Sequence, residues 1–262
     1  MDFLVNLFNV ALYKPLFNAL VLLYEFLPGK DFGIAIIVLT VLIRIILYPL
    51  GSQAIKSQKV LQELQPKIKE IQEKYKNEKE KLTKATLELY QKEKINPLSG
   101  CLPLLIQLPI IIALYRVFWK GFQVEQLSSS LYSFVPHISA IDPYFVGIID
   151  LSKTCTTKIV ENGSQSLTLV WPSIILVLLT GIVQFFQTKM TSPKALKGSS
   201  VSGPSDFSQI MQKQMLYFFP VFTVFILWNL PAAIALYWLT TTVFAVLQQY
   251  LIFKKTKNAL PS

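Results

Sequence analysis

Long runs of apolar residues alternate with shorter polar segments along this chain. A helix crosses the hydrocarbon of a bilayer with about 20 apolar residues. Residues 32–50 contain one charge, Arg44, and residues 100–119 contain one, Arg116. Residues 167–187 contain none. We therefore expect each of these three runs to form a transmembrane helix.

A fourth run, residues 214–253, has no charge and is too long for one span. Asn229–Leu230–Pro231 interrupts it near its middle, and proline is disfavoured in a helix interior. This predicts two further spans, 214–229 and 232–253, joined by a tight turn. The expected fold class is all-α: a polytopic membrane protein with a core of five transmembrane helices.

The N-terminal segment, residues 1–31, is apolar but less uniform. Its Phe, Leu and Val residues are interrupted by polar ones: Asn6, Asn9, Lys14, Asn18 and Glu25. It lacks the basic leader and the small-residue cleavage site of a signal peptide. We favour an amphipathic helix that lies in the membrane interface, rather than a sixth span.

Basic residues are unevenly distributed between the loops. Of the 23 Lys and Arg residues outside the spans, 18 lie in residues 51–99, 188–213 and 254–262. The other five lie in residues 1–31 and 120–166. Because cytoplasmic loops carry the excess of Lys and Arg, the first group is expected in the cytoplasm. The N-terminus and the loop 120–166 are then outside, and the C-terminal tail is inside.

The cytoplasmic segment 51–99 carries two apolar stripes with helical spacing. The first stripe is Leu64, Ile68, Ile71 and Tyr75; the second is Leu82, Thr86 and Leu89. A polar turn at Lys76–Asn77–Glu78 separates them, which predicts an antiparallel helical hairpin. Pro66 suits the first turn of the first helix. Periodicity leaves two interpretations open, a soluble spacer or a docking arm for a ribosome, a targeting factor or a substrate.

The composition argues against a soluble enzyme. Only 15% of the residues are charged, whereas about 25% is usual in soluble domains. One His and two Cys are too few for a metal cage or a disulfide framework, and Cys101 and Cys155 are expected on opposite sides of the membrane. We expect no catalytic residue, no metal, no cofactor and no direct readout of nucleic acid.

Arg44 is the most unusual residue, because it lies within the first span. It precedes Leu50 by six residues, about 9 Å along a helix. An intramembrane arginine costs about 2.5–3.5 kcal/mol on insertion scales and normally faces a bundle interior or a wet cavity. Snorkelling of its side chain to the headgroups is the alternative. Arg116 lies near the outer end of its span, where snorkelling is expected.

No predicted span contains an acidic partner for Arg44. Neutral polar residues are available instead, among them Thr40 one turn before it, Gln107 in the second span and Gln184 in the third. An unpaired cation in a water-filled recess that opens to the cytoplasm fits this inventory. Such a site would attract anionic segments.

Four segments of the chain match one known family, and together they extend over roughly residues 32–253. They are Asn96–Ile110 (NPLSGCLPLLIQLPI) with Ala113–Leu114–Tyr115; Leu42–Ile43–Arg44 before Tyr48–Pro49–Leu50; Gln65–Lys76 (QPKIKEIQEKYK); and Pro231–Trp238 (PAAIALYW) with Gln248–Gln249. With these segments the sequence resembles the YidC/Oxa family of membrane protein insertases. The resemblance is to the short bacterial form without a large periplasmic domain, in the plasma (inner) membrane.

The resemblance implies five core spans around a hydrophilic groove that is open to the cytoplasm and to lipid. In such a groove Arg44 would receive polar or acidic parts of an incoming chain. Thr40 and Trp238 match groove positions that contact substrate, and Gln107 and Gln184 are further candidates. The hairpin resembles a mobile coiled coil that recruits partners.

The implied function is insertion of nascent membrane proteins into the lipid bilayer. The implied partners besides substrate are the ribosome, the signal recognition particle pathway and the Sec translocon. Two other classes compete with this interpretation: a small-anion transporter or channel that uses Arg44, and a scaffold that docks ribosomes through the basic hairpin. Many transporters contain an internal repeat, and the sequence shows no such repeat between the two halves of this chain.

Overall fold

A computed structural model describes most of the chain. The described residues are 2–76, 78–93, 102–121, 131–136, 138, 140–161, 164–192 and 205–258. Most of them are helical, which confirms the expected all-α membrane protein. The helices are α1 (Asp2–Phe8), the π-helix η1 (Asn9–Tyr13), α2 (Lys14–Phe26), α3 (Phe32–Ile46), α4 (Tyr48–Glu63), α5 (Gln65–Lys74), α6 (Lys79–Lys92), α7 (Leu102–Gly121), α9 (Trp171–Thr191), α10 (Ser205–Trp228) and α11 (Ala232–Asn258).

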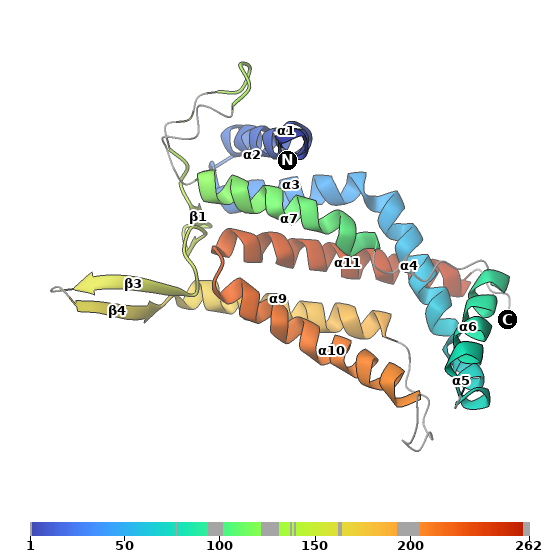
Figure 1. Ribbon diagram of the computed structural model, residues 1–262. Helices are drawn as coiled ribbons and strands as arrows, with labels where there is room; N and C mark the ends of the chain where they lie inside the picture. The colour runs from blue at the N-terminus through green and yellow to red at the C-terminus, as the bar shows by residue number, and fades with distance from the viewer. Residues whose placement is uncertain are drawn as a thin grey trace.

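Helix α11 lies at the centre of a bundle, between α3 and α7 on one side and α9 and α10 on the other (Figure 1). Its first six residues, 232–237, are all buried. Three of them are alanines, and small residues let helix backbones approach closely within a membrane. The central position of α11 allows it to contribute side chains to both halves of the bundle.

Three described helices are long and apolar enough to cross a membrane, and the bent pair of α3 and α4 makes a fourth if it is counted as one span. These helices include residues 5–26, 171–191 and 232–254. Two shorter apolar helices cover residues 105–119 and 216–228. A core of five spans therefore remains a prediction.

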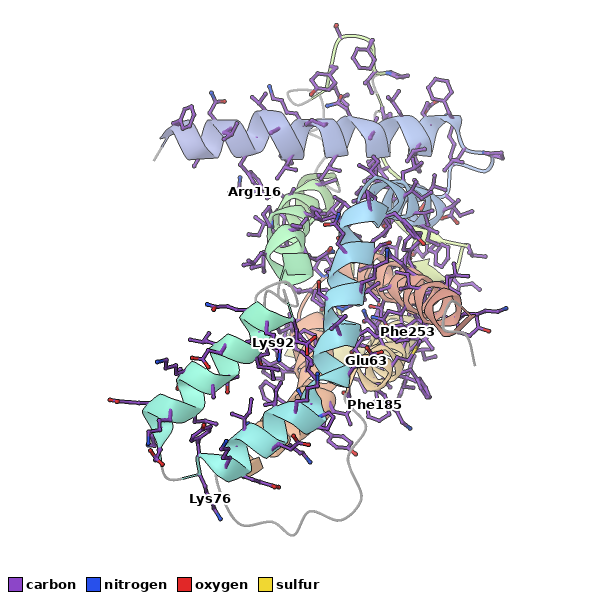
Figure 2. All side chains as sticks on the ribbon, turned by 90° about the vertical axis from the view of Figure 1, so that its right-hand side faces the viewer. Glu63, Lys76, Lys92, Arg116, Phe185 and Phe253 are labelled. Carbon is purple, nitrogen blue, oxygen red and sulfur yellow. The ribbon has the colours of Figure 1, made fainter. Side chains whose placement is uncertain are left out.

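The N-terminal helix, formed by α1, η1 and α2, runs across the bundle instead of along it. In Figure 1 it is seen nearly end-on above α3, and in Figure 2 it lies lengthwise while the bundle helices point toward the viewer. It packs against α3 and α7. Its length and hydropathy would allow a span, so its position in the membrane interface remains a prediction.

The expected single helix over residues 32–50 is corrected by the structure. Helix α3 ends at Ile46, and α4 begins at Tyr48 after a bend of 67°. Pro49 lies in the first turn of α4, where its missing N–H costs nothing. If α3 continued without a bend, the ring of Pro49 would clash with the preceding helical turn. The helix therefore bends before Pro49, although the apolar run continues to Leu50.

The hairpin that the sequence predicts in residues 51–99 consists of α5 and α6, and α4 connects it to the bundle. Helix α5 begins at Gln65 and has Pro66 in its first turn, as predicted. Leu64 and Ile68 of the first stripe are buried, but α6 has no buried residue. An ion pair of 2.7 Å between Lys67 and Glu93 joins the two arms. The hairpin is thus lightly packed and held partly by charge.

The segment between α7 and α9, which is predicted to be the outer loop, contains two small antiparallel sheets that the sequence did not predict. Strands β1 (Tyr144–Phe145) and β2 (Ile149–Asp150) form one sheet, and β3 (Thr156–Glu161) and β4 (Ser164–Leu169) form the other. The β3–β4 hairpin projects from the end of the bundle opposite to α5 and α6 (Figure 1).

The third predicted span is also corrected. Residues 167–169 belong to β4, and α9 begins at Trp171 with Pro172 in its first turn. An apolar stretch this short suits a strand as well as a helix, so hydropathy does not separate the two. At the cytoplasmic side, α9 continues to Thr191 and α10 starts at Ser205, which shortens the expected loop 188–213.

The remaining predicted boundaries differ by smaller amounts. Helix α7 extends to Gly121, two residues beyond the predicted end of the second span, and α11 continues from the predicted end at residue 253 to Asn258. Cys101 lies outside the described residues, whereas Cys155 is a buried free thiol in the outer loop.

Candidate functional site

Arg44 lies in the last turn of α3 and faces two other helices. Its Nη2 donates a hydrogen bond of 3.2 Å to Oε1 of Gln107 on α7. The side-chain amide of Gln107 in turn donates to the hydroxyl of Tyr237 on α11. This chain of hydrogen bonds connects three helices that are far apart in the sequence, and the half-buried guanidinium is at one end of it.

The partners of Arg44 are neutral. All the ion pairs between described residues lie in the outer loops, in the hairpin or in the segments beside it, and none involves Arg44. A cation in a medium of low dielectric is stabilised far more by a carboxylate than by an amide oxygen. Among the described residues, the charge of Arg44 is therefore solvated by dipoles and has no counter-charge.

Gln184 and Trp238 form a second polar pair within the bundle. The indole Nε1 of Trp238 on α11 donates a hydrogen bond of 2.9 Å to Oε1 of Gln184 on α9. The Gln184 side chain is buried. One turn earlier on α9, the buried Thr180 hydroxyl bonds to the carbonyl of Leu176 at 2.8 Å.

Thr40 does not join either pair. Its hydroxyl is buried and donates a hydrogen bond of 2.6 Å to the carbonyl of Ile36 in its own helix. No hydrogen bond between Thr40 and Arg44 is present among the described residues. Four of the five predicted site residues thus form two hydrogen-bonded pairs, and the fifth bonds only to its own backbone.

Tyr237 is the site residue that the sequence reasoning missed. It is adjacent to Trp238 in the same motif, but successive helical residues point about 100° apart. Tyr237 consequently reaches α7, whereas Trp238 reaches α9. The sequence did offer a signal for Tyr237. A buried Tyr hydroxyl normally requires a polar partner, so a tyrosine in an expected span predicts a hydrogen bond to a polar residue nearby.

Gln248, in the second half of α11, contacts the start of α4 just after the bend that follows Arg44. Its Nε2 donates hydrogen bonds to the carbonyl of Tyr48 at 3.0 Å and to the hydroxyl of Ser52 at 3.1 Å. Gly51 lets the two helices approach, because a Cβ there would lie 3.1 Å from the same amide nitrogen. These contacts hold the start of α4, which follows Arg44 in the chain, against α11.

At the opposite end of the bundle, residues 151–155 of the loop pair with the ends of α10 and α11. The backbone N–H groups of Ala232 and Ala233, at the start of α11, donate to the carbonyls of Lys153 and Leu151 at 2.9 and 3.0 Å. The N–H of Cys155 donates to the carbonyl of Trp228, at the end of α10, at 3.3 Å. The loop therefore satisfies backbone groups that helix ends leave unpaired.

No metal centre is formed by the part of the chain that the structure describes, because no three His, Cys, Asp or Glu residues come together there. The chemistry of the site is that of hydrogen bonding and charge. Its groups are one cation, two amides, a phenol and an indole.

These features define a polytopic helical membrane protein with an uncompensated cation between three of its helices. The chain belongs to the YidC/Oxa family: residues 22–259 match the family described as 60Kd inner membrane protein.

Several curated relatives carry the name membrane protein insertase YidC. The protein from Fusobacterium nucleatum is 37% identical over 86% of this chain and 87% of its own length. That from Geobacter sulfurreducens is 34% identical over 95% of this chain but only 38% of its own length. That from Helicobacter pylori is 35% identical over 94% of this chain and 37% of its own length. This chain thus spans less than two fifths of the length of two of these relatives.

Proposed function

We propose that this protein is a membrane protein insertase that receives polar parts of nascent membrane proteins at Arg44 and releases their apolar segments into the bilayer. The observation that carries the proposal is the neutral surroundings of Arg44, which bonds to Gln107 and no carboxylate among the described residues. An entering acidic side chain would supply the missing counter-charge.

The arrangement of the two bundle ends supports entry from the cytoplasm. Outer-loop carbonyls cover the start of α11, while Arg44 lies in the last turn of α3, next to the bend that leads to the hairpin. The interior between these ends is polar at Gln107, Gln184 and Trp238. A hydrophilic groove at this position would shorten the dry path that a polar flank must cross.

The electrostatic energies favour transient binding of an acidic group beside Arg44. Bringing one charge next to Arg44 offsets part of the cost of moving that charge into the membrane, which is several kcal/mol. Burial of the apolar stretch in lipid then drives release sideways. An inside-negative potential pulls an acidic flank outward with about 2.3 kcal/mol per charge per 100 mV. Thr40 is proposed to contact the entering chain, once its hydroxyl leaves the Ile36 carbonyl.

We further propose a bacterial inner-membrane location, with the N-terminus outside and the C-terminus in the cytoplasm. The distribution of Lys and Arg supports this orientation. The crosswise N-terminal helix is proposed to lie in the outer interface (Figure 2). The basic hairpin α5–α6 is proposed to recruit the ribosome, the signal recognition particle pathway or the Sec translocon. The alternative of a small-anion transporter has no support from the relatives, whose name is that of an insertase.

The proposal is tested by reconstitution of the full chain into liposomes with two single-span substrates that differ only in tail charge. In Arg44→Gln, insertion of the acidic-tailed substrate should fall about tenfold or more, since a charge-assisted hydrogen bond contributes about 1.5–3 kcal/mol. Insertion of the neutral-tailed substrate should change less than about twofold. Lys153→Gln, which removes an exposed cation in the outer loop, is the matched control. Equal insertion of both substrates by Arg44→Gln and the wild type would refute the role of Arg44.

A further inference from the structure

A second intramembrane cation, Arg116, meets the N-terminal helix at a site of its own. Arg116 is exposed and lies on α7, five residues before its end at Gly121. Figure 2 shows it between α7 and the crosswise helix. Its Nη1 lies 3.5 Å from Oδ1 of Asn9, and its guanidinium lies 5.2 Å from the ring centre of Phe8.

The crosswise helix is locally widened where it meets Arg116. Residues Asn9–Tyr13 form the π-helix η1, a rare element that is often found at functional sites. The backbone N–H of Lys14 bonds to the carbonyl of Asn9, so that one wide turn separates these two residues. This places a second exposed cation on the crosswise helix one turn from the residue that touches Arg116.

The two cations lack an acidic partner. Neither Lys14 nor Arg116 belongs to an ion pair between described residues. The contacts of Arg116 are a long hydrogen bond to an amide oxygen and an aromatic face, which together compensate little of its charge. A negatively charged group is therefore the chemical complement of this site.

Exposed apolar side chains lie on both helices that carry the two cations. Tyr115 and Trp119 stack on each other beside Arg116, with 6.0 Å between ring centres, and Trp119 is 54% exposed. On the crosswise helix Val5, Leu7 and Val10 are each about half exposed. Tyr and Trp side chains concentrate at the boundary between hydrocarbon and headgroups. A ligand here has a charged end between Lys14 and Arg116 and apolar tails along these side chains.

We propose that the angle between η1 and α7 binds the headgroup phosphate of an anionic phospholipid through Arg116 and Lys14. The occupant is a lipid and not free phosphate, because the exposed apolar side chains beside the cations would contact acyl chains. The bound lipid connects the crosswise helix to α7. This site is separate from Arg44, which contacts Gln107 on a different part of α7.

Native mass spectrometry of the detergent-purified full chain tests the site. The protein is mixed with phosphatidylglycerol and phosphatidylcholine of identical acyl chains. The wild type should retain phosphatidylglycerol in preference, and Lys14→Gln/Arg116→Gln should lose affinity for it by about 30-fold, the effect of two basic residues near a membrane surface. Lys30→Gln/Lys153→Gln removes the same charge from the outer loops and should keep the preference.

Three outcomes would overturn the proposal: equal retention of both lipids by the wild type, equal losses in the two double variants, or complete displacement of the lipid by millimolar inorganic phosphate. The last would assign the site to free phosphate.

Thermal unfolding separates binding from folding, since added phosphatidylglycerol should raise the melting temperature of the wild type and of Arg116→Lys. An absence of any such shift in the wild type would also contradict the proposal.

Discussion

The indole nitrogen of Trp238 lies 2.9 Å from the buried side-chain oxygen of Gln184, and this hydrogen bond joins α11 to α9. Next to it on α11, Tyr237 receives a hydrogen bond from Gln107 on α7. Two adjacent side chains of the central helix thus connect to opposite sides of the bundle. The same two residues hold the amides that would surround an entering polar segment.

Substitution of Trp238 by Phe is expected to destabilise the bundle by about 1–3 kcal/mol, because the buried oxygen of Gln184 loses its donor. The free energy of unfolding in mixed detergent micelles measures this change. Since the smaller ring also leaves a void, the hydrogen bond is isolated by a double-mutant cycle with Gln184→Leu. We expect a coupling of about 1 kcal/mol. A coupling near zero would mean that the bond contributes nothing to stability.

Gly33→Ala is expected to destabilise the outer end of α3. A Cβ at residue 33 would overlap the ring of Phe145 in β1, so the loop or the helix must shift. Overpacking of this kind costs about 1–3 kcal/mol, measurable as a lowered melting temperature. Phe145→Ala in the same chain removes the two nearest overlapping atoms, Cγ and Cδ2, and Gly33→Ala should therefore cost less in this background than in the wild type.

Gly29→Ala separates steric overlap from backbone strain. Gly29 has a φ of +83° but nothing within 4 Å of a Cβ position. Its substitution should cost only the strain of a left-handed conformation, about 1–2 kcal/mol, and this cost should be the same in the Phe145→Ala background. Rescue of both glycine variants alike would contradict the predicted overlap.

The contact between the hairpin arms should depend on pH. The hydrogen bond and the charge of Lys67 lower the pKa of the Glu93 carboxyl below its ordinary value of 4.5. A carboxyl with a lowered pKa in the folded state stabilises the contact above its unfolded pKa, and this contribution is lost as the pH falls from about 4.5 through the lowered value. Distances between labels on α5 and α6 should therefore stay constant from pH 8 to about 5 and increase at lower pH.

Lys67→Gln provides the control for this titration. The variant lacks the ion pair at every pH, so its label distances should show a weaker pH dependence than those of the wild type. The effect is small, because both side chains are on the surface and water screens the pair. An unchanged pH dependence in Lys67→Gln would show that another group causes the opening.

The local sequence pattern correctly predicted features that are determined by residues close together in the chain, such as the positions of helices. Apolar runs located the bundle helices, and Pro66 indicated the start of α5. The same reasoning failed where one apolar run contains two elements. Leu167 and Leu169 pair with β3 as residues of β4, and Tyr48 begins a new helix after α3. A sum of hydropathies does not record a change of direction or of backbone conformation.

The sequence by itself determined the class of protein, the family, the lone cation in the first span and the amides able to meet it. Only the tertiary structure decided that Arg44 bonds to Gln107, that Gln184 bonds to Trp238, and that Tyr237 completes the first group while Thr40 stays with its own helix. The physical reason is that periodicity fixes which residues share a face of one helix. The rotation and crossing of packed helices decide which faces meet. The direction of the N-terminal helix across the bundle is set in the same way, by its packing against α3 and α7 (Figure 2).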